Sequence, residues 1–344
     1  MTDTPKKETS SVLESQADPT ASSTFGCRIL RDEAEVFTQN AWDHAEWTEE
    51  QEDLARNKVE LQKQNPVPLA DQDQYNENPA QYWNEFYTRN ENRFFKDRRW
   101  LRVEFPELFA TPPADSADPD SLAEPPTSAP KSNGEIKEGA ATKNPQDRFN
   151  VMEIGCGAGN AFFPLLAEHT HPDFFGYACD FSETAVQVVR DSPHYDPTRG
   201  EAFVWDLTSP HLPTQVQAGT IDVILLVFVM SAIHPGHWDQ VMQNLNKLLR
   251  PGGIILFRDY GRYDMAQLRF KSKRLLSDNF YIRGDGTRVY FFTNEQLAEL
   301  FGKYLLIEQN AVDRRLIVNR HRQIKMFRVW LQGKFRKPLT SSTK

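Results

Sequence analysis

The sequence predicts an α/β fold: a mostly parallel seven-stranded sheet with helices on both faces, a C-terminal antiparallel hairpin and an N-terminal helical extension. Three observations predict it. From residue 149 onward, strand-like apolar runs alternate with helical segments, which is typical of a parallel sheet. Apart from Asp222, the run 221–229 is apolar and rich in β-branched residues, as expected of a strand buried on both faces. A glycine loop, GCGAGN, directly follows the first of these runs.

The N-terminal third of the chain divides into three parts. Residues 1–24 are polar and rich in Ser and Thr, which predicts a disordered tail. Residues 25–109 form the helical, aromatic-rich extension, in which the stretch from Thr48 begins with a capping box to Gln51. Residues 79–108 read as helical and aromatic-rich. Residues 110–147 hold seven prolines and no aromatic residue, so they read as a linker or an insert.

Residues 148–338 carry the alternating elements in order. The predicted strands are 149–154, 174–180, 201–207, 221–229 and 253–260, followed by the hairpin strands 304–318 and 324–332. The predicted helices run from the glycine loop to about 168, and over 183–191, 236–250 and 294–302. The segment Arg250-Pro251-Gly252-Gly253 is a helix-stop signal that separates the third of these helices from the next strand.

Charge is distributed unevenly along the chain. The net charge is −8, but residues 1–80 carry 7 basic and 17 acidic residues, whereas residues 262–338 carry 17 basic and 7 acidic ones. The segment 89–102 adds six cations against two acids. This asymmetry indicates a polyanion-binding face beside an acidic arm. The alternative is an ordinary surface whose charges happen to be unevenly spread.

The sequence favours a cytoplasmic protein. No window approaches the roughly 20 apolar residues of a membrane span, and the N-terminus shows no signal or transit peptide. The three cysteines, Cys27, Cys156 and Cys179, have no CxxC spacing, which is typical of a reducing compartment.

The glycine loop decides between nucleotide classes. Gly155, Gly157 and Gly159 have the spacing GxGxG, and Asn160 stands where the dinucleotide fingerprint needs a third glycine. No GxxxxGK[ST] phosphate loop is present, so ATP is disfavoured as well. With Glu153 two residues before the loop, the pattern suits a ligand without a pyrophosphate.

Two aspartates follow neighbouring strands and point to the same crevice. Asp180 ends one strand and can accept from both ribose hydroxyls, and Asp206 ends the next and can accept from an adenine amino group. Each could instead be a helix cap, although Ser182 is the better cap and leaves Asp180 free. A cationic sulfonium cofactor favours an acidic rim. These features together predict S-adenosylmethionine.

The motifs then match a known family. The series ExGxGxG, ACDFS, WDLT and FVMSAIHP resembles the Rossmann-like class I S-adenosylmethionine-dependent methyltransferases. The blocks FFKDRRWL, ACDFSETAV, LLVFVMSAIHP, LFRDYGRYDMAQLRF and FYIRGDGTRVYFFT resemble the eukaryotic tRNA 3-methylcytidine methyltransferases, over about residues 25–337 except the linker. The N-terminal block FGCRILRDEAEVFTQNAWDHAEWTEEQ is similar to the branch acting on threonine tRNAs and, in some members, arginine tRNAs. The resemblance implies methylation of cytidine 32 in the anticodon loop.

The implied chemistry needs few groups. Neutral cytosine N3 carries an in-plane lone pair, so alignment and electrostatics suffice without a general base. Asp259 is the candidate that faces the ring and stabilises its developing charge, although it could instead pair with Arg258 or Arg262. The base must be splayed out, and Tyr260 is a candidate to stack on it. Phe228 lies inside an apolar run and reads as core.

The resemblance also implies the cofactor site and part of the RNA site. The family places a matching Trp and Tyr over the cofactor, here Trp83 and Tyr87, which lie four residues apart on one helical face. Arg98 matches a residue near the cofactor and the RNA, and Lys96 and Arg99 suit phosphate contacts. The positions that match family cofactor residues are Gly157, Asp180, Asp206, Leu207 and Val227.

Arginines of the C-terminal region are candidates to follow the phosphate backbone: Arg283, Arg288, Arg314, Arg315, Arg320 and Arg322. His234 and His237 lack a supporting ligand pattern, so no metal site is predicted. Predicted partners are the tRNA anticodon arm and an auxiliary protein such as a tRNA synthetase or a tRNA-binding adaptor, with no membrane. Two other readings remain: a methyltransferase acting on another RNA or a protein, and a non-catalytic RNA-binding adaptor.

Overall fold

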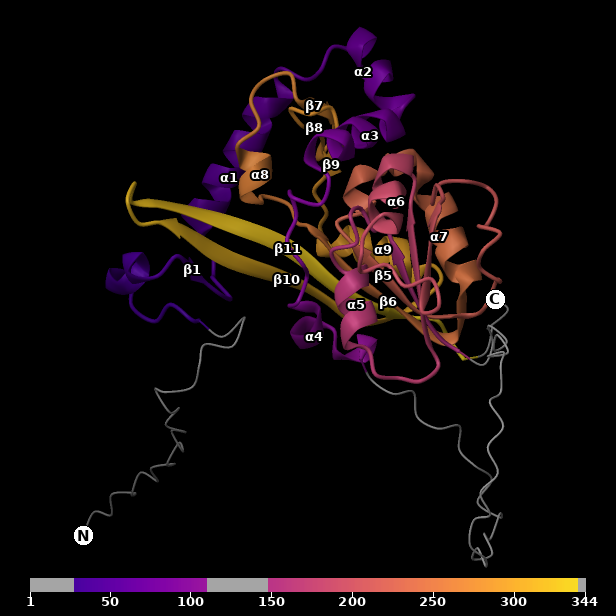
Figure 1. Ribbon diagram of the computed structural model, residues 1–344. Coiled ribbons are helices and arrows are strands. Elements are labelled where there is room, and N and C mark those ends of the chain that lie inside the picture. The colour runs from indigo at the N-terminus through magenta and orange to yellow at the C-terminus, as the bar shows by residue number, and fades with distance from the viewer. Residues whose placement is uncertain (1–27, 110–147, 340–344) are drawn as a thin grey trace, which may run out of the picture.

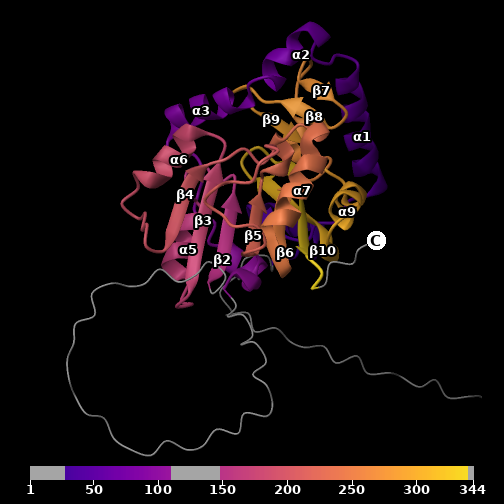
Figure 2. The same ribbon diagram turned by 90° about the vertical axis from the view of Figure 1, so that its right-hand side faces the viewer.

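The computed structural model describes residues 28–109 and 148–339. Its main sheet has eight strands in the order β1-β10-β11-β6-β5-β2-β3-β4. Figure 2 shows β4, β3, β2, β5 and β6 side by side; these five are parallel, whereas β11, β10 and β1 join antiparallel. The bounds are β1 Ala41–Trp42, β2 Phe149–Ile154, β3 Phe174–Asp180, β4 Gly200–Val204, β5 Ile221–Val227, β6 Leu249–Tyr260, β10 Leu306–Asn319 and β11 Ile324–Arg336. The predicted seven strands are present, and a two-residue β1 from the extension adds an eighth.

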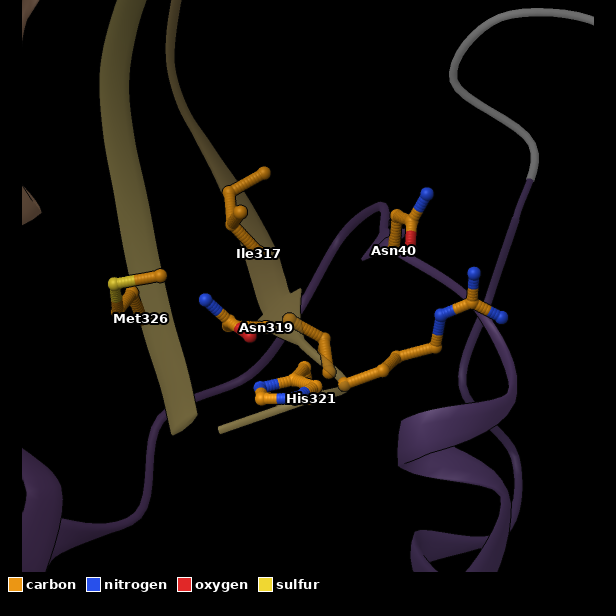
Figure 3. Close-up of a pocket in the computed structure, with 7 residues that line it drawn as sticks. Asn40, Ile317, Asn319, His321 and Met326 are labelled. Carbon is orange, nitrogen blue, oxygen red and sulfur yellow. The ribbon is translucent and has the colours of Figure 1, made fainter. Parts of the chain in front are cut away.

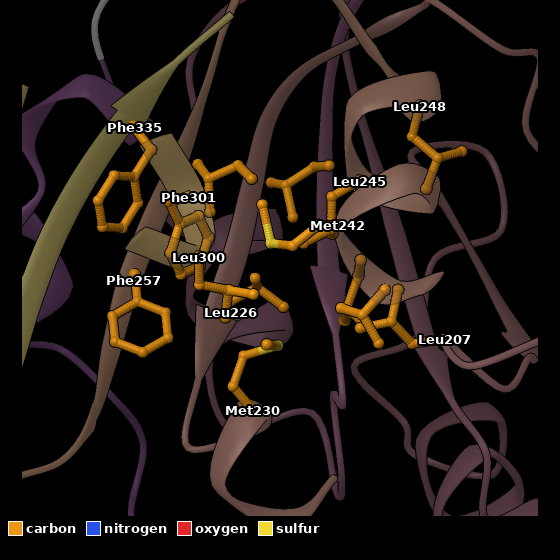
Figure 4. Packing of buried hydrophobic residues seen from close by; sticks show 14 of the residues in the cluster. Leu207, Leu226, Met230, Met242, Leu245, Leu248, Phe257, Leu300, Phe301 and Phe335 are labelled. Atoms are coloured by element: carbon orange, nitrogen blue, oxygen red, sulfur yellow. The ribbon is translucent and has the colours of Figure 1, made fainter. Parts of the chain in front are cut away.

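Helices cover both faces of the sheet because its strands alternate buried side chains between two clusters. In β5, Val223 and Leu225 pack on the face of α5 and α6, whereas Ile224 and Leu226 pack on the face of α7 and α9. Figure 4 shows the second cluster, where Leu226 and Phe257 meet helix residues such as Met242. The bounds are α5 Phe162–Glu168, α6 Glu183–Arg190, α7 Trp238–Leu248 and α9 Asn294–Gly302.

The helices over residues 49–90 of the N-terminal extension lie near a second, three-stranded sheet at the carboxyl ends of the parallel strands (Figure 1). Hydrogen bonds join the extension to this region. The Val67 N–H donates to the Leu275 carbonyl (2.8 Å), and the Gln62 side chain donates to the Gln267 carbonyl (2.9 Å). The extension comprises η1 Glu33–Thr38, α1 Glu49–Lys63, α2 Leu69–Asn76, α3 Pro79–Asn90, α4 Leu101–Glu104 and η2 Pro106–Leu108. The second sheet and its neighbours are η4 Met230–Ala232, η5 Pro235–His237, α8 Met265–Leu268, β7 Leu275–Ser277, β8 Phe280–Ile282 and β9 Arg288–Tyr290.

Some predicted boundaries are confirmed and others are wrong. The capping box of Thr48 and Gln51 is present in both directions. Residues 79–108 are not one helix, since α3 ends at Asn90 and the chain turns before α4. The third predicted parallel strand stops at Val204 rather than 207, and the third helix stops at 248, where β6 already begins. The tail 1–24 and the segment 110–147 lie outside the described residues.

Candidate functional site

The glycine loop follows β2 and passes directly under Tyr87. Gly155 and Gly157 have φ values of 67° and 54°, a region that favours glycine. A Cβ at Gly157 would collide with the Tyr87 hydroxyl from α3. The loop therefore depends on glycine both for its backbone conformation and for the close approach of the N-terminal extension.

Asp180 ends β3 and anchors that loop. Its carboxylate accepts from the backbone N–H of Gly157 (3.0 Å) and of Ser182 (2.9 Å), so it holds the loop, and it is not the cap of α6. Ser182 does cap α6, accepting from the Ala185 N–H, as predicted. Burial raises the Asp180 pKa to about 6, although the amides of Ser182, Gly157 and Phe181 oppose the shift. A carboxylate with two backbone donors retains lone pairs for a ligand.

Glu153 and Arg98 meet behind the loop. Glu153 is 2% exposed, and burial raises its pKa to about 7 although Arg98 opposes the shift. The Arg98 Nη1 lies 4.0 Å from the Glu153 carboxylate and donates to the Val227 carbonyl (3.2 Å). Glu153 is not part of the cavity wall described next, so its contact with the site runs through Arg98.

A cavity of about 520 Å³ opens between the carboxyl ends of the parallel strands and the extension. Thirteen of the predicted site residues line it: Trp83, Tyr87, Lys96, Arg98, Gly155, Gly157, Asp180, Asp206, Leu207, Val227, Tyr260, Arg283 and Arg288. Gly159 and Glu153 lie behind its wall. Asp206 follows β4 by two residues and accepts from the Thr208 N–H and hydroxyl, both at 2.8 Å.

One end of the cavity is aromatic. Phe228 and Tyr260 have ring centres 4.9 Å apart, and Trp330 lies 6.4 Å from Phe228. The expectation that Phe228 is a core residue is wrong: it follows the end of β5 with φ 60° and lines the cavity. Its backbone N–H still donates to Arg258, which continues the sheet pairing while the side chain turns outward.

Several lining residues were not predicted from the sequence. Trp205 and Trp100 stand in the motif blocks WDLT and FFKDRRW, so their positions offered a signal. Trp330 and Arg328 come from β11 and Asn76 from α2, and no local pattern marks them.

Asp259 does not reach the cavity wall. It is fully buried, and its carboxylate accepts from the Ser231 N–H of η4 (2.9 Å) and from the Tyr260 N–H (2.8 Å). Burial raises its pKa to about 6 against the hydrogen bonds of Ser231 and Tyr260. Arg258 pairs elsewhere, with Asp313. The expectation that Asp259 faces the base is thus not met, and its contacts favour a positioning role.

The predicted phosphate-contacting residues fall into three groups. Lys96, Arg99, Arg320 and Arg322 are exposed, and Arg283 and Arg314 are half-buried over the rings of Tyr260 and Trp47. Arg315 is 7% exposed and pairs with Asp43, Glu104 and Asp313 at 3.3 to 3.4 Å, so its prediction as a surface phosphate contact is wrong. Arg288 is also buried, but it lines the inner cavity.

A second hollow of about 730 Å³ lies at the free end of the β10–β11 hairpin (Figure 3). Figure 3 shows Asn40 facing Ile317 and Asn319 across it. Although larger in volume, it has no glycine loop and no carboxylate among its lining residues. We therefore assign the cofactor to the inner cavity.

The described residues offer neither a group of metal ligands nor a membrane-spanning helix. Over residues 28–109 and 148–339, no three His, Cys, Asp or Glu side chains are grouped to hold an ion. His234 instead caps η5, its Nδ1 accepting from the Gly236 N–H at 3.1 Å. None of the helices in those ranges is long and apolar enough to cross a membrane.

Comparisons with known proteins agree on one chemistry. A family model described as a methyltransferase domain matches residues 106–304. The chain is 46% identical to tRNA N(3)-methylcytidine methyltransferase trm140 of Schizosaccharomyces pombe, over 96% of this chain and 97% of that protein. It is also 46% identical to tRNA N(3)-cytidine methyltransferase METTL2 of Danio rerio, over 95% of this chain and 92% of that protein. The tRNA(Thr) (cytosine(32)-N(3))-methyltransferase of Saccharomyces cerevisiae is 46% identical over 91% of this chain, which matches 46% of that protein.

Proposed function

The chain belongs to the tRNA N(3)-methylcytidine methyltransferase family, and from that membership we propose that it forms 3-methylcytidine at cytidine 32 in the anticodon loop of threonine tRNA. It is an S-adenosylmethionine-dependent tRNA methyltransferase. The threonine tRNA and position 32 are named for the relative in Saccharomyces cerevisiae, and arginine tRNAs are a further substrate to test. The observation that carries the proposal is the inner cavity, where the glycine loop and Asp180 meet an aromatic end.

The residues at the cavity fit S-adenosylmethionine, which supplies an electrophilic methyl group on a sulfonium sulfur when bound. A volume of about 520 Å³ is within the range of sites for small-molecule cofactors. The glycine loop allows a ligand to approach the backbone, and Asp180 and Asp206 offer carboxylate oxygens to the ribose and the adenine. Trp83 and Tyr87 of α3 would cover the cofactor, and Leu207 and Val227 add apolar walls.

The chain orients the acceptor and excludes water; it need not remove a proton. The neutral cytosine N3 attacks with its in-plane lone pair, so turnover rests on alignment and electrostatics. Tyr260 and Phe228 offer rings for stacking an extruded base. Asp259 holds the Ser231 amide and with it the segment after β5 that carries Phe228. We propose that Asp259 positions this wall instead of touching the base.

The exposed cations form the proposed tRNA surface. Lys96 and Arg99 lie on the turn before α4 at the cavity, Arg283 borders the cavity, and Arg320 and Arg322 lie at the hairpin end. Arg314 is half-buried, and its guanidinium lies over the Trp47 ring. Phosphate contacts of this kind position the RNA without reading its sequence.

Two further expectations stay proposals. The cytoplasm is supported by Cys156 and Cys179, both buried and free thiols. An auxiliary protein, such as a tRNA synthetase or tRNA-binding adaptor, would be required if the purified chain binds cofactor and tRNA without turnover.

The test is to incubate the purified chain with labelled S-adenosylmethionine and threonine, arginine or serine tRNA, and to locate the product by nucleoside mass spectrometry. We expect 3-methylcytidine at position 32 of threonine tRNA, and its loss in Asp180→Ala. A methylated product at another position, or on protein alone, would refute the proposed substrate. Cofactor binding without a product, even after a cell extract is added, would refute the proposed activity.

A further inference from the structure

Arg288 is a buried guanidinium that makes no ion pair with a carboxylate in the described part of the chain. It lies at the start of β9, is 6% exposed and lines the cavity. Its Nη1 donates to the Asn76 side-chain oxygen at 3.1 Å, and its guanidinium lies 5.6 Å from the Phe280 ring centre. Over residues 28–109 and 148–339, no carboxylate oxygen pairs with it and its Nε has no hydrogen-bond partner. Burial lowers its pKa only to about 10, so it is charged at neutral pH.

The other cations of the cavity are compensated or solvated. Arg328 lies 3.1 Å from the Asp264 carboxylate, Arg98 lies 4.0 Å from Glu153, Arg283 is half-buried over the Tyr260 ring, and Lys96 is exposed. A buried charge without a partner is costly to folding, so its retention on a cavity wall indicates an anionic ligand. The Arg288 guanidinium has donors left for one, because Asn76 engages a single nitrogen.

Two anions enter the proposed reaction: the carboxylate of the cofactor and the phosphates of the tRNA. Arg98 already stands at the glycine-loop end, where its backbone N–H donates to the Asn160 carbonyl. Arg288 instead lies over the Phe280 ring, which also contacts His234, and the Asp206 carboxylate offsets part of its charge. Asp206 is the proposed acceptor for the adenine. The adenine and the carboxylate group of the cofactor are at opposite ends of that molecule. The position of Arg288 therefore favours a phosphate.

We propose that Arg288, held by Asn76, is an internal phosphate site that binds the tRNA phosphate adjoining the target cytidine. This inference rests on the proposed function and deepens it: the site fixes the extruded nucleotide from inside the cavity, whereas the exposed cations hold the tRNA from outside. A guanidinium suits this task because its planar donors can engage two phosphate oxygens at once.

The experiment measures binding of the full chain to anticodon stem-loops whose phosphates on either side of the target cytidine are replaced singly by uncharged methylphosphonates. For the wild type, we expect one replacement to weaken binding about tenfold, the cost of a lost charged hydrogen bond. Arg288→Gln should bind the native stem-loop equally weakly and lose nothing further with that replacement. Its slope of log affinity against log salt should fall by about 1. Arg288→Lys should restore the slope.

Control measurements distinguish a tRNA phosphate from the cofactor carboxylate as the ligand of Arg288, and separate this inference from the proposed function. Lys303→Gln, which removes an exposed cation at the end of α9, should keep wild-type binding. Calorimetry with S-adenosylhomocysteine should give the same affinity for wild type and Arg288→Gln; a loss there would assign Arg288 to the cofactor carboxylate and overturn the inference. Equal sensitivity of both proteins to every methylphosphonate would also overturn it. If the wild type methylates no tRNA, the proposed function fails independently of these binding results.

The thermal stability of an Arg288 variant separates a binding role of this residue from a structural one. Arg288→Met keeps the apolar stem and removes a buried charge that lacks a direct ion pair, so its melting temperature should equal or exceed that of the wild type while stem-loop binding falls. A lower melting temperature would show that Arg288 holds the fold, and would overturn the inference.

Discussion

At the scale of single residues, the site depends on two buried aspartates, and their burial makes them harder to ionise. The pKa of Asp180 is raised from 3.8 to about 6, and that of Asp259 is raised to the same value, chiefly by desolvation. Their hydrogen bonds differ, however. Asp180 lines the cavity and can meet a ligand, whereas Asp259 faces the Ser231 amide behind the wall. Two similar buried aspartates thus lead to different predictions.

Asp180 should make cofactor binding depend on pH. Because its pKa is about 6, the carboxyl becomes neutral as the pH falls below 6, and a neutral carboxyl attracts the sulfonium cofactor less. We expect the affinity for S-adenosylmethionine to fall about tenfold between pH 7 and pH 5, measured by calorimetry. S-Adenosylhomocysteine, which lacks the sulfonium charge, should show a weaker dependence. Equal affinity for S-adenosylmethionine at both pH values would contradict the assignment.

Asp259 should tolerate loss of its charge but not of its oxygen. Asp259→Asn keeps one acceptor oxygen for the Ser231 amide but sets its NH2 group against the Tyr260 N–H, so it should lose some stability while turnover stays within a few-fold of the wild type. Asp259→Ala leaves that amide buried and unpaired, which costs about 1–3 kcal/mol of unfolding free energy and lowers turnover. Denaturant unfolding and initial rates check both variants. A folded Asp259→Asn with no turnover would return Asp259 to a direct electrostatic role.

At the scale of elements, one arginine joins the extension to the sheet. Arg258 of β6 is 3% exposed, and its guanidinium pairs with Asp313 of β10 and lies 3.8 Å from Glu104 of α4. The same guanidinium lies 5.0 Å from the Trp100 ring centre and 4.7 Å from that of Trp330, and both rings line the cavity. The cavity wall and the docking of α4 therefore share one buried charge network.

Removing that arginine should destabilise the whole domain. Arg258→Met leaves Asp313 and Glu104 with less compensation, so we expect a loss of roughly 3–5 kcal/mol in urea unfolding. Arg89→Ala, which breaks an exposed pair with Glu85, should cost under about 1 kcal/mol. Similar costs for the two variants would show that the buried network contributes no more than a surface pair.

At the scale of the whole molecule, cations at two distant places should act on one tRNA. The β10–β11 hairpin extends well away from the parallel strands and carries Arg320 and Arg322 near its free end (Figure 1). Lys96 and Arg283 line the cavity at the other place. For all of these cations to contact its phosphates, one tRNA would have to reach both places.

The hairpin should therefore contribute to tRNA affinity without touching the cofactor. The double variant Arg320→Gln/Arg322→Gln should lower the slope of log affinity against log salt by about 2 and leave S-adenosylmethionine binding unchanged. Arg315→Gln, by contrast, should lower thermal stability, because Arg315 compensates buried carboxylates. An unchanged salt slope in the double variant would exclude the hairpin from the tRNA surface.

The sequence by itself determined the sheet and most of the cofactor side of the cavity. The glycine loop, Asp180 and Leu207 lie where local pattern placed them, because parallel strands bring their carboxyl ends to one edge of a sheet. The strands 149–154 and 174–180 match to the residue, since mostly apolar residues fill each run and the glycine loop and Asp180 mark where the runs end. Motif blocks also carried the family resemblance.

Only the tertiary structure decided which charges are buried and which face solvent. Arg288, Arg315 and Arg320 look alike in the sequence, yet the first lines a cavity, the second sits among carboxylates and the third is exposed. Likewise, only the structure shows that Asp259 contacts the Ser231 amide and does not face the cavity. Side-chain burial depends on contacts between residues far apart in the chain, such as Asn76 with Arg288, and no local spacing encodes those contacts.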